Sequence, residues 1–149
     1  MESNLPLRIA VRVIIHKEDK ICICSEISDD GLITRITFPG GGVEEGDNKE
    51  TTAIKECLEE VGILIKNPQS MDLITTYSST GKSYRAVENH YYRAEYDRMD
   101  KTLYGNGNDA MDFSWVSIEK AIDLIKIGPK SIYTEYKLKA LNMLLEYSY

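Results

Sequence analysis

The feature that most constrains the fold is a glycine-rich stretch placed directly before a helical pattern. The stretch Phe38–Gly46 holds four glycines, at positions 40, 41, 42 and 46. This glycine content is too high for a regular element. It predicts a loop whose backbone can adopt positive φ and approach a ligand closely.

A helix is predicted over Asn48–Val61. Asp47 is a good N-cap residue, Glu50 would complete a capping box with it, and Gly62 is well placed to end the helix. The apolar residues that recur at helical spacing are Ala53, Ile54, Cys57, Leu58 and Val61.

Three glutamates of this helix carry the functional interpretation. Glu56, Glu59 and Glu60 stand at i, i+3 and i+4, so their side chains converge on one face of a helix. Like charges this close repel, and a hard cation among their oxygens would offset the repulsion, as Mg²⁺ prefers carboxylate and water ligands. A solvated acidic face is the alternative. The succession of glycine loop, capped helix and acidic cluster favours the metal site.

The remaining patterns place strands before and after this helix and two helices at the end of the chain. The predicted strands are Leu7–Ile15, Ile21–Ile27, Leu32–Thr37, Met71–Ser78, Tyr84–Tyr96 and Asp112–Val116, and the later helices are Ser117–Ile127 and Ser131–Glu146. Neither a repeat nor a low-complexity linker interrupts them, so residues 1–149 are interpreted as a single domain of the α/β (α+β) class, with a mixed sheet and helices on both faces.

The net charge and the lengths of the apolar runs limit the kinds of partner that the protein can have. The net charge of −6 argues against binding to DNA or long RNA, because an acidic surface gains nothing from counterion release. The apolar runs are too short to span a bilayer, and no signal peptide is recognised. With three cysteines, the chain is expected to be a soluble protein of the reducing cytoplasm. An anionic substrate would then need a cation to screen it.

The segment from Gly41 to Ile63 resembles the Nudix box. That box is Gly, five residues, Glu, seven residues, Arg-Glu, an aliphatic residue, any residue, Glu-Glu, any residue, Gly and an aliphatic residue. Asp47, Lys55 and Cys57 depart from it, standing for glutamate, arginine and an aliphatic residue. Lysine cannot offer the bidentate fork of arginine, and a shortened ion pair between Lys55 and Asp47 is one outcome. The resemblance implies a Nudix-like α/β/α sandwich.

The resemblance also implies a site. Glu56, Glu59 and Glu60 would hold one or more Mg²⁺ ions, with Mn²⁺ as a substitute and the carbonyl of Gly40 as a further ligand. Either Glu59 or Glu56 would act as general base, and the sequence does not choose between them. In many relatives a later loop adds another acid, for which Asp109 and Asp112 are the candidates.

Other residues are candidates for contact with the substrate. Arg35, Gly41 and Gly42 lie in or just before the glycine-rich stretch and could touch a phosphate. A stacking platform for a base could come from the tyrosines Tyr77, Tyr84, Tyr91 and Tyr92.

The function implied is Mg²⁺-dependent hydrolysis of a diphosphate bond in a nucleoside diphosphate linked to another moiety, such as ADP-ribose or a dinucleoside polyphosphate. A nucleoside triphosphate pyrophosphatase is an alternative within the same chemistry. A non-catalytic Nudix-fold module that binds a nucleotide or a protein is an alternative of another class, favoured by Asp47 and Lys55. Apolar residues of the last helix, such as Leu141 and Leu144, would serve either the core or a homodimer interface.

Overall fold

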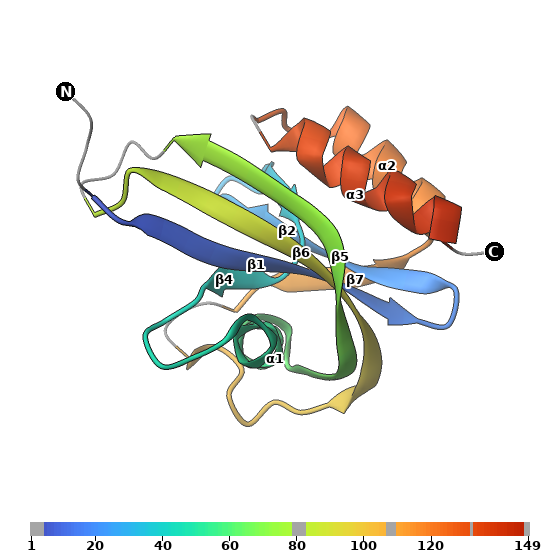
Figure 1. The fold of residues 1–149 in the computed structure, drawn as a ribbon. Helices are drawn as coiled ribbons and strands as arrows, with labels where there is room; N and C mark the ends of the chain where they lie inside the picture. The colour runs from blue at the N-terminus through green and yellow to red at the C-terminus, as the bar shows by residue number, and fades with distance from the viewer. Residues whose placement is uncertain (1–4, 79–82, 107–109, 132, 148–149) are drawn as a thin grey trace.

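The computed structural model describes residues 5–78, 83–106, 110–131 and 133–147, which form one seven-stranded mixed sheet and three helices (Figure 1). The elements are β1 (Leu7–Lys17), β2 (Lys20–Ile27), β3 (Ile33–Thr37), β4 (Gly40–Gly42), α1 (Lys49–Val61), β5 (Ile63–Ser78), β6 (Ala86–Met99), β7 (Asp112–Val116), α2 (Ile118–Ile127) and α3 (Thr134–Tyr147). The strand order is β3-β2-β1-β6-β5, with β4 paired to β1 and β7 to β2. Only the β1–β6 pair is parallel among the strand pairs of this described part.

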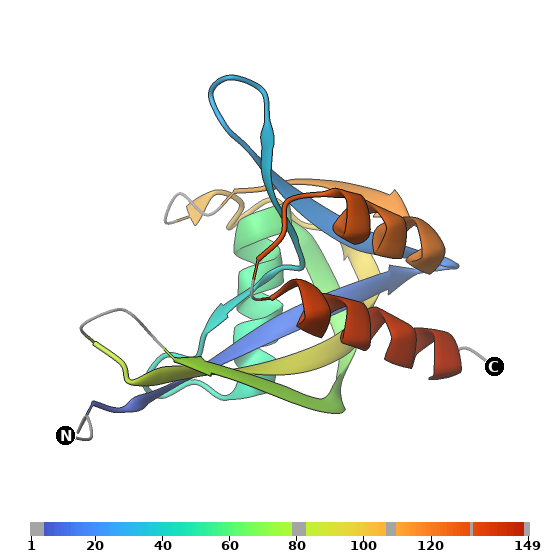
Figure 2. The same ribbon diagram turned by 90° about the horizontal axis from the view of Figure 1, so that it is seen from above.

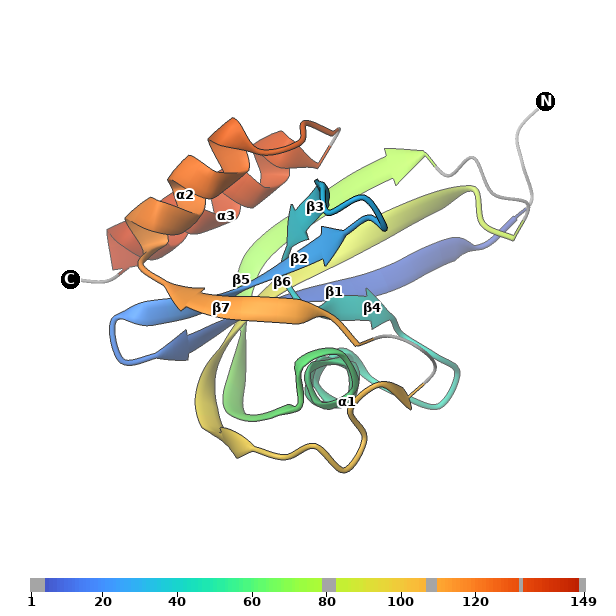
Figure 3. The same ribbon diagram turned by 180° about the vertical axis from the view of Figure 1, so that it is seen from behind.

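Helices cover the two faces of the sheet, which confirms the predicted α/β/α sandwich. Figure 1 shows α1 on one side and the α2–α3 pair on the other, and Figure 2 shows α2 and α3 lying side by side over the strands. Figure 3 shows β7 next to β2 on the far side of the molecule. None of the described helices is long and apolar enough to cross a membrane.

The central strand β1 sorts its side chains between these two layers. Val11 and Val13 are buried in the apolar cluster that includes α1, whereas Ile14 is buried in the cluster beneath α2 and α3. Successive side chains of a strand point to opposite faces. Arg8 and Arg12 therefore share the face of Ile14, so two arginines stand on one side of β1.

The glycine-rich stretch is not wholly irregular, so the prediction of a loop from Phe38 to Gly46 was wrong over its centre. Residues Gly40–Gly42 form β4, which pairs antiparallel with residues 10–12 of β1. A Cβ at Gly40 would overlap the backbone carbonyl of Val11. Only a strand without side chains fits here, and local propensity could not reveal it, because the pairing joins residues about 30 positions apart in the chain.

The N-cap of α1 is Asn48, so the predicted cap at Asp47 and its capping box were wrong. Asn48 has extended backbone angles, and its side chain accepts a 2.8 Å hydrogen bond from the Thr51 amide. The carboxylate of Glu50 instead accepts a 3.1 Å hydrogen bond from the Tyr92 hydroxyl. The amide of Asp47 donates to the carbonyl of Glu44, which places Asp47 in the preceding turn.

Strand β5 starts at Ile63, much earlier than the predicted Met71. Gly62 ends α1 in the left-handed conformation, with φ 66°, and the chain enters the sheet at once. The register of β5 against β6 shifts three times, and Asn67 and Asp72 have positive φ. These irregularities break the alternation of apolar and polar residues, which is why the pattern did not predict a strand there.

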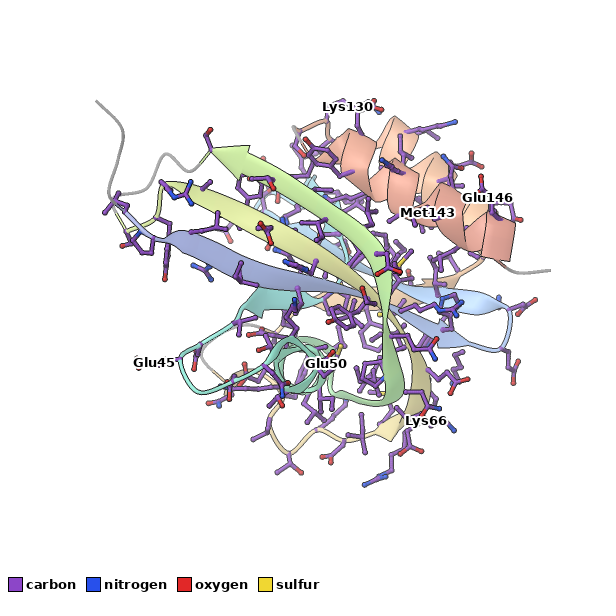
Figure 4. All side chains as sticks on the ribbon, viewed as in Figure 1. Glu45, Glu50, Lys66, Lys130, Met143 and Glu146 are labelled. Atoms are coloured by element: carbon purple, nitrogen blue, oxygen red, sulfur yellow. The ribbon has the colours of Figure 1, made fainter. Side chains whose placement is uncertain are left out.

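The last helix packs its leucines inward. Leu141 and Leu144 of α3 are buried in the cluster beneath α2 and α3, so the core accounts for these two side chains. A homodimer interface stays a prediction that this structure does not test. Figure 4 shows Met143 and Glu146 on the same helix.

We expect the Asn48→Ala variant to lose about 1 kcal/mol of unfolding free energy, the usual effect of removing an N-cap side chain. Asp47→Ala is the matched control, one residue away and with no capping bond to α1. Urea denaturation followed by circular dichroism would measure both. Equal losses in the two variants, or a larger loss for Asp47→Ala, would contradict the assignment of Asn48 as the cap.

Candidate active site

A cavity of ≈ 570 Å³ opens between β4, the first loop residues after it and α1, and we call it the glycine cavity. Its walls combine bare backbone with carboxylates and one arginine. The residues that line it are Arg8, Gly40, Gly41, Gly42, Val43, Glu44, Glu45, Glu56, Glu60 and Tyr84. Figure 4 shows Glu45 at the outer turn of the loop that joins β4 to α1.

Glu60 is held against β4 by the backbone. The amide of Gly40 donates a 2.7 Å hydrogen bond to Oε1 of Glu60. A hydrogen bond to an ionised acceptor is short and roughly twice as strong as one between neutral groups. This bond holds the C-terminal part of α1, which carries the acids, next to β4.

Glu56 lies one helical turn before Glu60 and reaches the same strand. A Cβ added at Gly41 would lie 2.7 Å from its carboxyl carbon, so glycine at position 41 leaves the room that this carboxylate occupies. Glu59 is placed differently. Its side chain is buried, and it is not among the residues that line the glycine cavity. The structure thus brings Glu56 and Glu60 together with Glu44 and Glu45.

The donor set of the glycine cavity fits a hard divalent cation. Two helical and two loop glutamates line one space, and Mg²⁺ is bound in proteins by carboxylate oxygens and water. Within the described ranges, no three acidic, histidine or cysteine side chains already stand close enough to hold a metal. The Glu60 carboxylate is turned to Gly40. Metal ligation by Glu56, Glu59, Glu60 and the Gly40 carbonyl therefore stays a prediction.

The two candidates for a later acid have different outcomes. Asp109 lies outside the described residues. Asp112 is the first residue of β7 and lines a separate cavity beside Ser25 and Glu26. The structure does not bring Asp112 to the glycine cavity.

Arg8 is a site residue that the sequence interpretation missed. Its guanidinium lies directly over Gly42, where a Cβ would overlap it, and 5.3 Å from the centre of the Tyr84 ring. Arg8 is thus the cation of the glycine cavity. The two-residue period of β1, which puts Arg8 and Arg12 on one face, was the signal that could have revealed it.

The glycine cavity continues along the sheet. A space of ≈ 310 Å³ shares Arg8, Gly41, Gly42 and Tyr84 with it. This space in turn shares Arg12, Tyr77 and Asn89 with a third space of ≈ 360 Å³. The three spaces form one cleft, which runs from the acids of α1 to the beginning of α3.

We call the third space the basic chamber. It is lined by Arg12, Arg35, Thr37, Thr75, Tyr77, Asn89, Tyr91, Tyr133 and Lys137. Arg35, predicted to touch a phosphate beside the glycine loop, lies here instead and forms a 3.1 Å ion pair with Glu26. Strand β3 carries Arg35 away from the glycine cavity, and residues 36–39 separate Arg35 from β4 along the chain.

The surroundings of two cations in the basic chamber disfavour their charged forms. Burial, and then the charge of Arg35, lower the pKa of Arg12. Burial, followed by repulsion from Arg35 and Arg12, lowers the pKa of Lys137 to about 8, and Glu26 only partly opposes this. Burial raises the pKa of Tyr91 to about 12, so this tyrosine is neutral at physiological pH.

The predicted tyrosine platform is only partly assembled. Tyr77 and Tyr91 line the basic chamber, and Tyr84 lines the glycine cavity. Tyr92, next to Tyr91 on β6, points to the opposite face of the sheet, where it belongs to the cluster with α1. A strand cannot present two adjacent side chains to one ligand.

Lys55, the main departure from the Nudix box, forms its ion pair with Glu44 rather than with Asp47. The distance between Nζ of Lys55 and Oε2 of Glu44 is 3.4 Å. The charge of Glu44, and less strongly those of Glu59 and Asp47, raise the pKa of Lys55. Lys55 thus still places a positive charge beside the acids of the glycine cavity.

Comparisons with known proteins place this geometry in context. A family model described as NUDIX domain matches residues 6–136. The 8-oxo-dGTP diphosphatase of Escherichia coli is 36% identical over 67 residues, which cover 45% of this chain and 50% of that protein, so the match spans half the length of this curated relative.

Solved structures share the fold at low sequence identity. A NUDIX hydrolase from Nitrosomonas europaea superposes with a TM-score of 0.63 at 18% identity, covering 90% of this chain and 86% of that one. An ADP compounds hydrolase superposes with a TM-score of 0.67 at 19% identity, covering 94% and 72%. At these identities the likeness concerns the fold alone.

The lowered pKa of Lys137 predicts a pH dependence of stability. In the unfolded chain its pKa returns towards 10.5, so between about 8 and 10 the unfolded state binds more protons than the folded state. The free energy of unfolding of the wild type should therefore rise over this interval relative to Lys137→Met, which lacks the titrating group.

Urea denaturation of the wild type and Lys137→Met at several pH values from 7 to 10 measures this difference. Lys139→Met, an exposed lysine of the same helix, is the control and should follow the wild type. A difference between wild type and Lys137→Met that stays constant across the interval would contradict the lowered pKa.

Proposed function

The chain belongs to the NUDIX domain family, and on this premise we propose that it is a divalent-metal-dependent hydrolase of a diphosphate bond in a nucleotide-like substrate. Membership confirms the resemblance found between Gly41 and Ile63. The observation that carries the proposal is the position of Glu56 and Glu60 against the bare backbone of β4, at one end of a cleft that contains arginines.

Glu56 and Glu60 would hold the cation, with Glu44 and Glu45 within the same cavity and Glu59 as a further predicted ligand. When bound, Mg²⁺ or Mn²⁺ supplies neutralisation of diphosphate oxygens and acidifies a coordinated water. The guanidinium of Arg8 would bind a phosphate oxygen, and its place over Gly42 holds it at the mouth of the cavity. Phosphoryl transfer depends mainly on such positioning and charge stabilisation.

The geometry of the glycine cavity favours Glu56 over Glu59 as the general base. A base must reach the proton that it removes, and Glu56 lines the glycine cavity whereas Glu59 is buried outside its lining. Glu56 would accept the proton of the attacking water at a carboxylate oxygen. Lys55 beside Glu44 would keep this loop close to α1.

Two substrate classes are supported by different observations. The cleft extends well beyond the glycine cavity, which favours a nucleoside diphosphate linked to another moiety. The similarity to an 8-oxo-dGTP diphosphatase favours a nucleoside triphosphate, although it covers half of that protein. Both would place the diphosphate at the glycine cavity.

We expect Glu56→Gln and Glu60→Gln each to lower turnover by at least ~10²-fold, the scale of losing a major electrostatic contribution to the transition state. Initial rates with Mg²⁺ on ADP-ribose, dinucleoside polyphosphates, nucleoside triphosphates and flavin or nicotinamide dinucleotides would identify the substrate class. Glu119→Gln, which changes an exposed acid of α2, is the control and should retain wild-type activity.

Circular dichroism would establish that each variant is folded. Full activity in Glu56→Gln or Glu60→Gln would remove that residue from the site. No turnover of any compound by the wild type, together with nucleotide binding, would instead favour the non-catalytic module.

A further inference from the structure

The basic chamber holds more positive charge than the structure neutralises. Three cationic side chains, Arg12, Arg35 and Lys137, line it, and the carboxylate of Glu26 pairs with Arg35 at its rim. The carboxylate of Glu60 also lies close enough to Arg12 to raise its pKa, so three positive charges less two negative charges leave a net charge of +1. The Glu26 side chain is 47% exposed, so solvent weakens even this compensation.

Two of these cations are not surface residues. Arg12 donates from Nη1 to the carbonyl of Phe38 at 3.3 Å, and Lys137 donates from Nζ to the carbonyl of Ile36 at 2.7 Å. Lys137 is only 8% exposed. Burying a charge is costly unless it is paired, and the two backbone carbonyls supply no counter-charge. Glu60 beside Arg12 and Glu26 beside Lys137 offset this cost only in part.

The donors of these cations are only partly used. A guanidinium has five N–H donors and an ammonium three. Within the described residues, the anchoring bonds to Phe38 and Ile36 use one donor each. The backbone thus fixes the two cations in place, and the other donors remain for a ligand in the chamber.

An unpartnered polar group at the same place points independently to a ligand. Asn89 is 5% exposed, and its Oδ1 has no hydrogen-bond partner among the described residues. Asn89 lines both the basic chamber and the space that connects it to the glycine cavity. A buried acceptor without a partner is costly, so a hydroxyl donor on the ligand would relieve it.

We propose that the basic chamber binds a phosphate monoester carried on a hydroxylated group of the substrate. A phosphate monoester carries about −1.5 to −2 charges at pH 7, opposite in sign to the charge of the chamber, and its three strong acceptor oxygens suit the remaining donors there. A hydroxyl beside it would donate to Asn89. The space of ≈ 360 Å³ has room for such a group.

A neutral nucleobase is the rival occupant, because tyrosines also line the chamber. However, Tyr77 and Tyr133 are packed edge to face against each other, with ring centres 4.8 Å apart, and Tyr91 packs edge to face on Phe38. Their rings are engaged with other rings. A neutral nucleobase would also leave the net positive charge of the chamber uncompensated.

This proposal rests on the proposed function in one respect, because it assigns the phosphate monoester to the molecule that is hydrolysed. With the diphosphate at the glycine cavity and the phosphate monoester in the basic chamber, the favoured substrate is a diphosphate compound with an additional phosphate on one of its sugars. The chamber's affinity for a phosphate monoester can be tested without hydrolysis.

The decisive measurement is calorimetric binding of ribose 5-phosphate and of ribose in metal-free buffer. Without a metal, the glycine cavity presents four carboxylates, which disfavour an anion there. We expect wild-type protein to bind ribose 5-phosphate at least about 10-fold more tightly than ribose, and Lys137→Met and Arg35→Gln each to lower this affinity by about 10-fold, the range of a lost charge-assisted hydrogen bond. Lys139→Met, exposed on the same helix, should leave it unchanged.

A second measurement compares hydrolysis of NADPH with NADH, and of coenzyme A with dephospho-coenzyme A, which differ by one phosphate monoester. Phosphate binding that depends on Lys137, without hydrolysis of any diphosphate, would support the chamber and overturn the proposed function. If a diphosphate is hydrolysed but ribose 5-phosphate does not bind, or binds equally well to Lys137→Met and Arg35→Gln, the basic chamber is not a phosphate site. The proposed function would still hold. Tighter binding of ribose than of ribose 5-phosphate would also overturn the chamber.

Discussion

The contact on which the candidate site depends is the close approach of β4 to its two neighbours. On one side the backbone of β4 pairs with β1 so tightly that a Cβ at Gly40 would overlap the Val11 carbonyl. On the other side the Gly40 amide holds Glu60, and Gly41 leaves room for Glu56. A strand with side chains would push α1 away from β1. The three glycines are therefore what allows carboxylates of a helix to face a sheet edge without intervening atoms.

This arrangement also explains how an acidic protein can offer a site for an anionic substrate. The net charge of −6 describes the whole chain, but the cleft has its own distribution of charge. Acids gather where α1 meets β4, and cations gather where β1 and β3 meet α3. Since β1 carries Arg8 and Arg12 on one face, the same strand supplies a cation to each end of the cleft.

The sequence predicted much of the fold because most elements have strong local patterns. The α1 helix, the strands on either side of the Lys17–Lys20 turn and the Ser117 cap of α2 all follow from spacing and capping residues. What it could not predict depends on contacts between distant residues. β4 exists only through β1, and the first half of β5 is irregular, so its pairing with β6 leaves no alternating pattern. The acids of α1 were predictable as a cluster, but the burial of Glu59 depends on packing against the rest of the fold.

The basic chamber was the least predictable part, because its residues come from five elements that are far apart in sequence. Lys137 reaches the carbonyl of Ile36 across 101 positions, and nothing in the composition of α3 distinguishes it from the exposed Lys139. The two ends of the cleft also differ in what constrains them. Most residues that line the glycine cavity belong to the Nudix box, whereas Arg12, Arg35 and Lys137 lie outside that box. Discrimination between substrates that share a diphosphate must come from the part of the site that the diphosphate does not occupy. In this chain that part is lined by cations, and we propose that its preference is for negative charge.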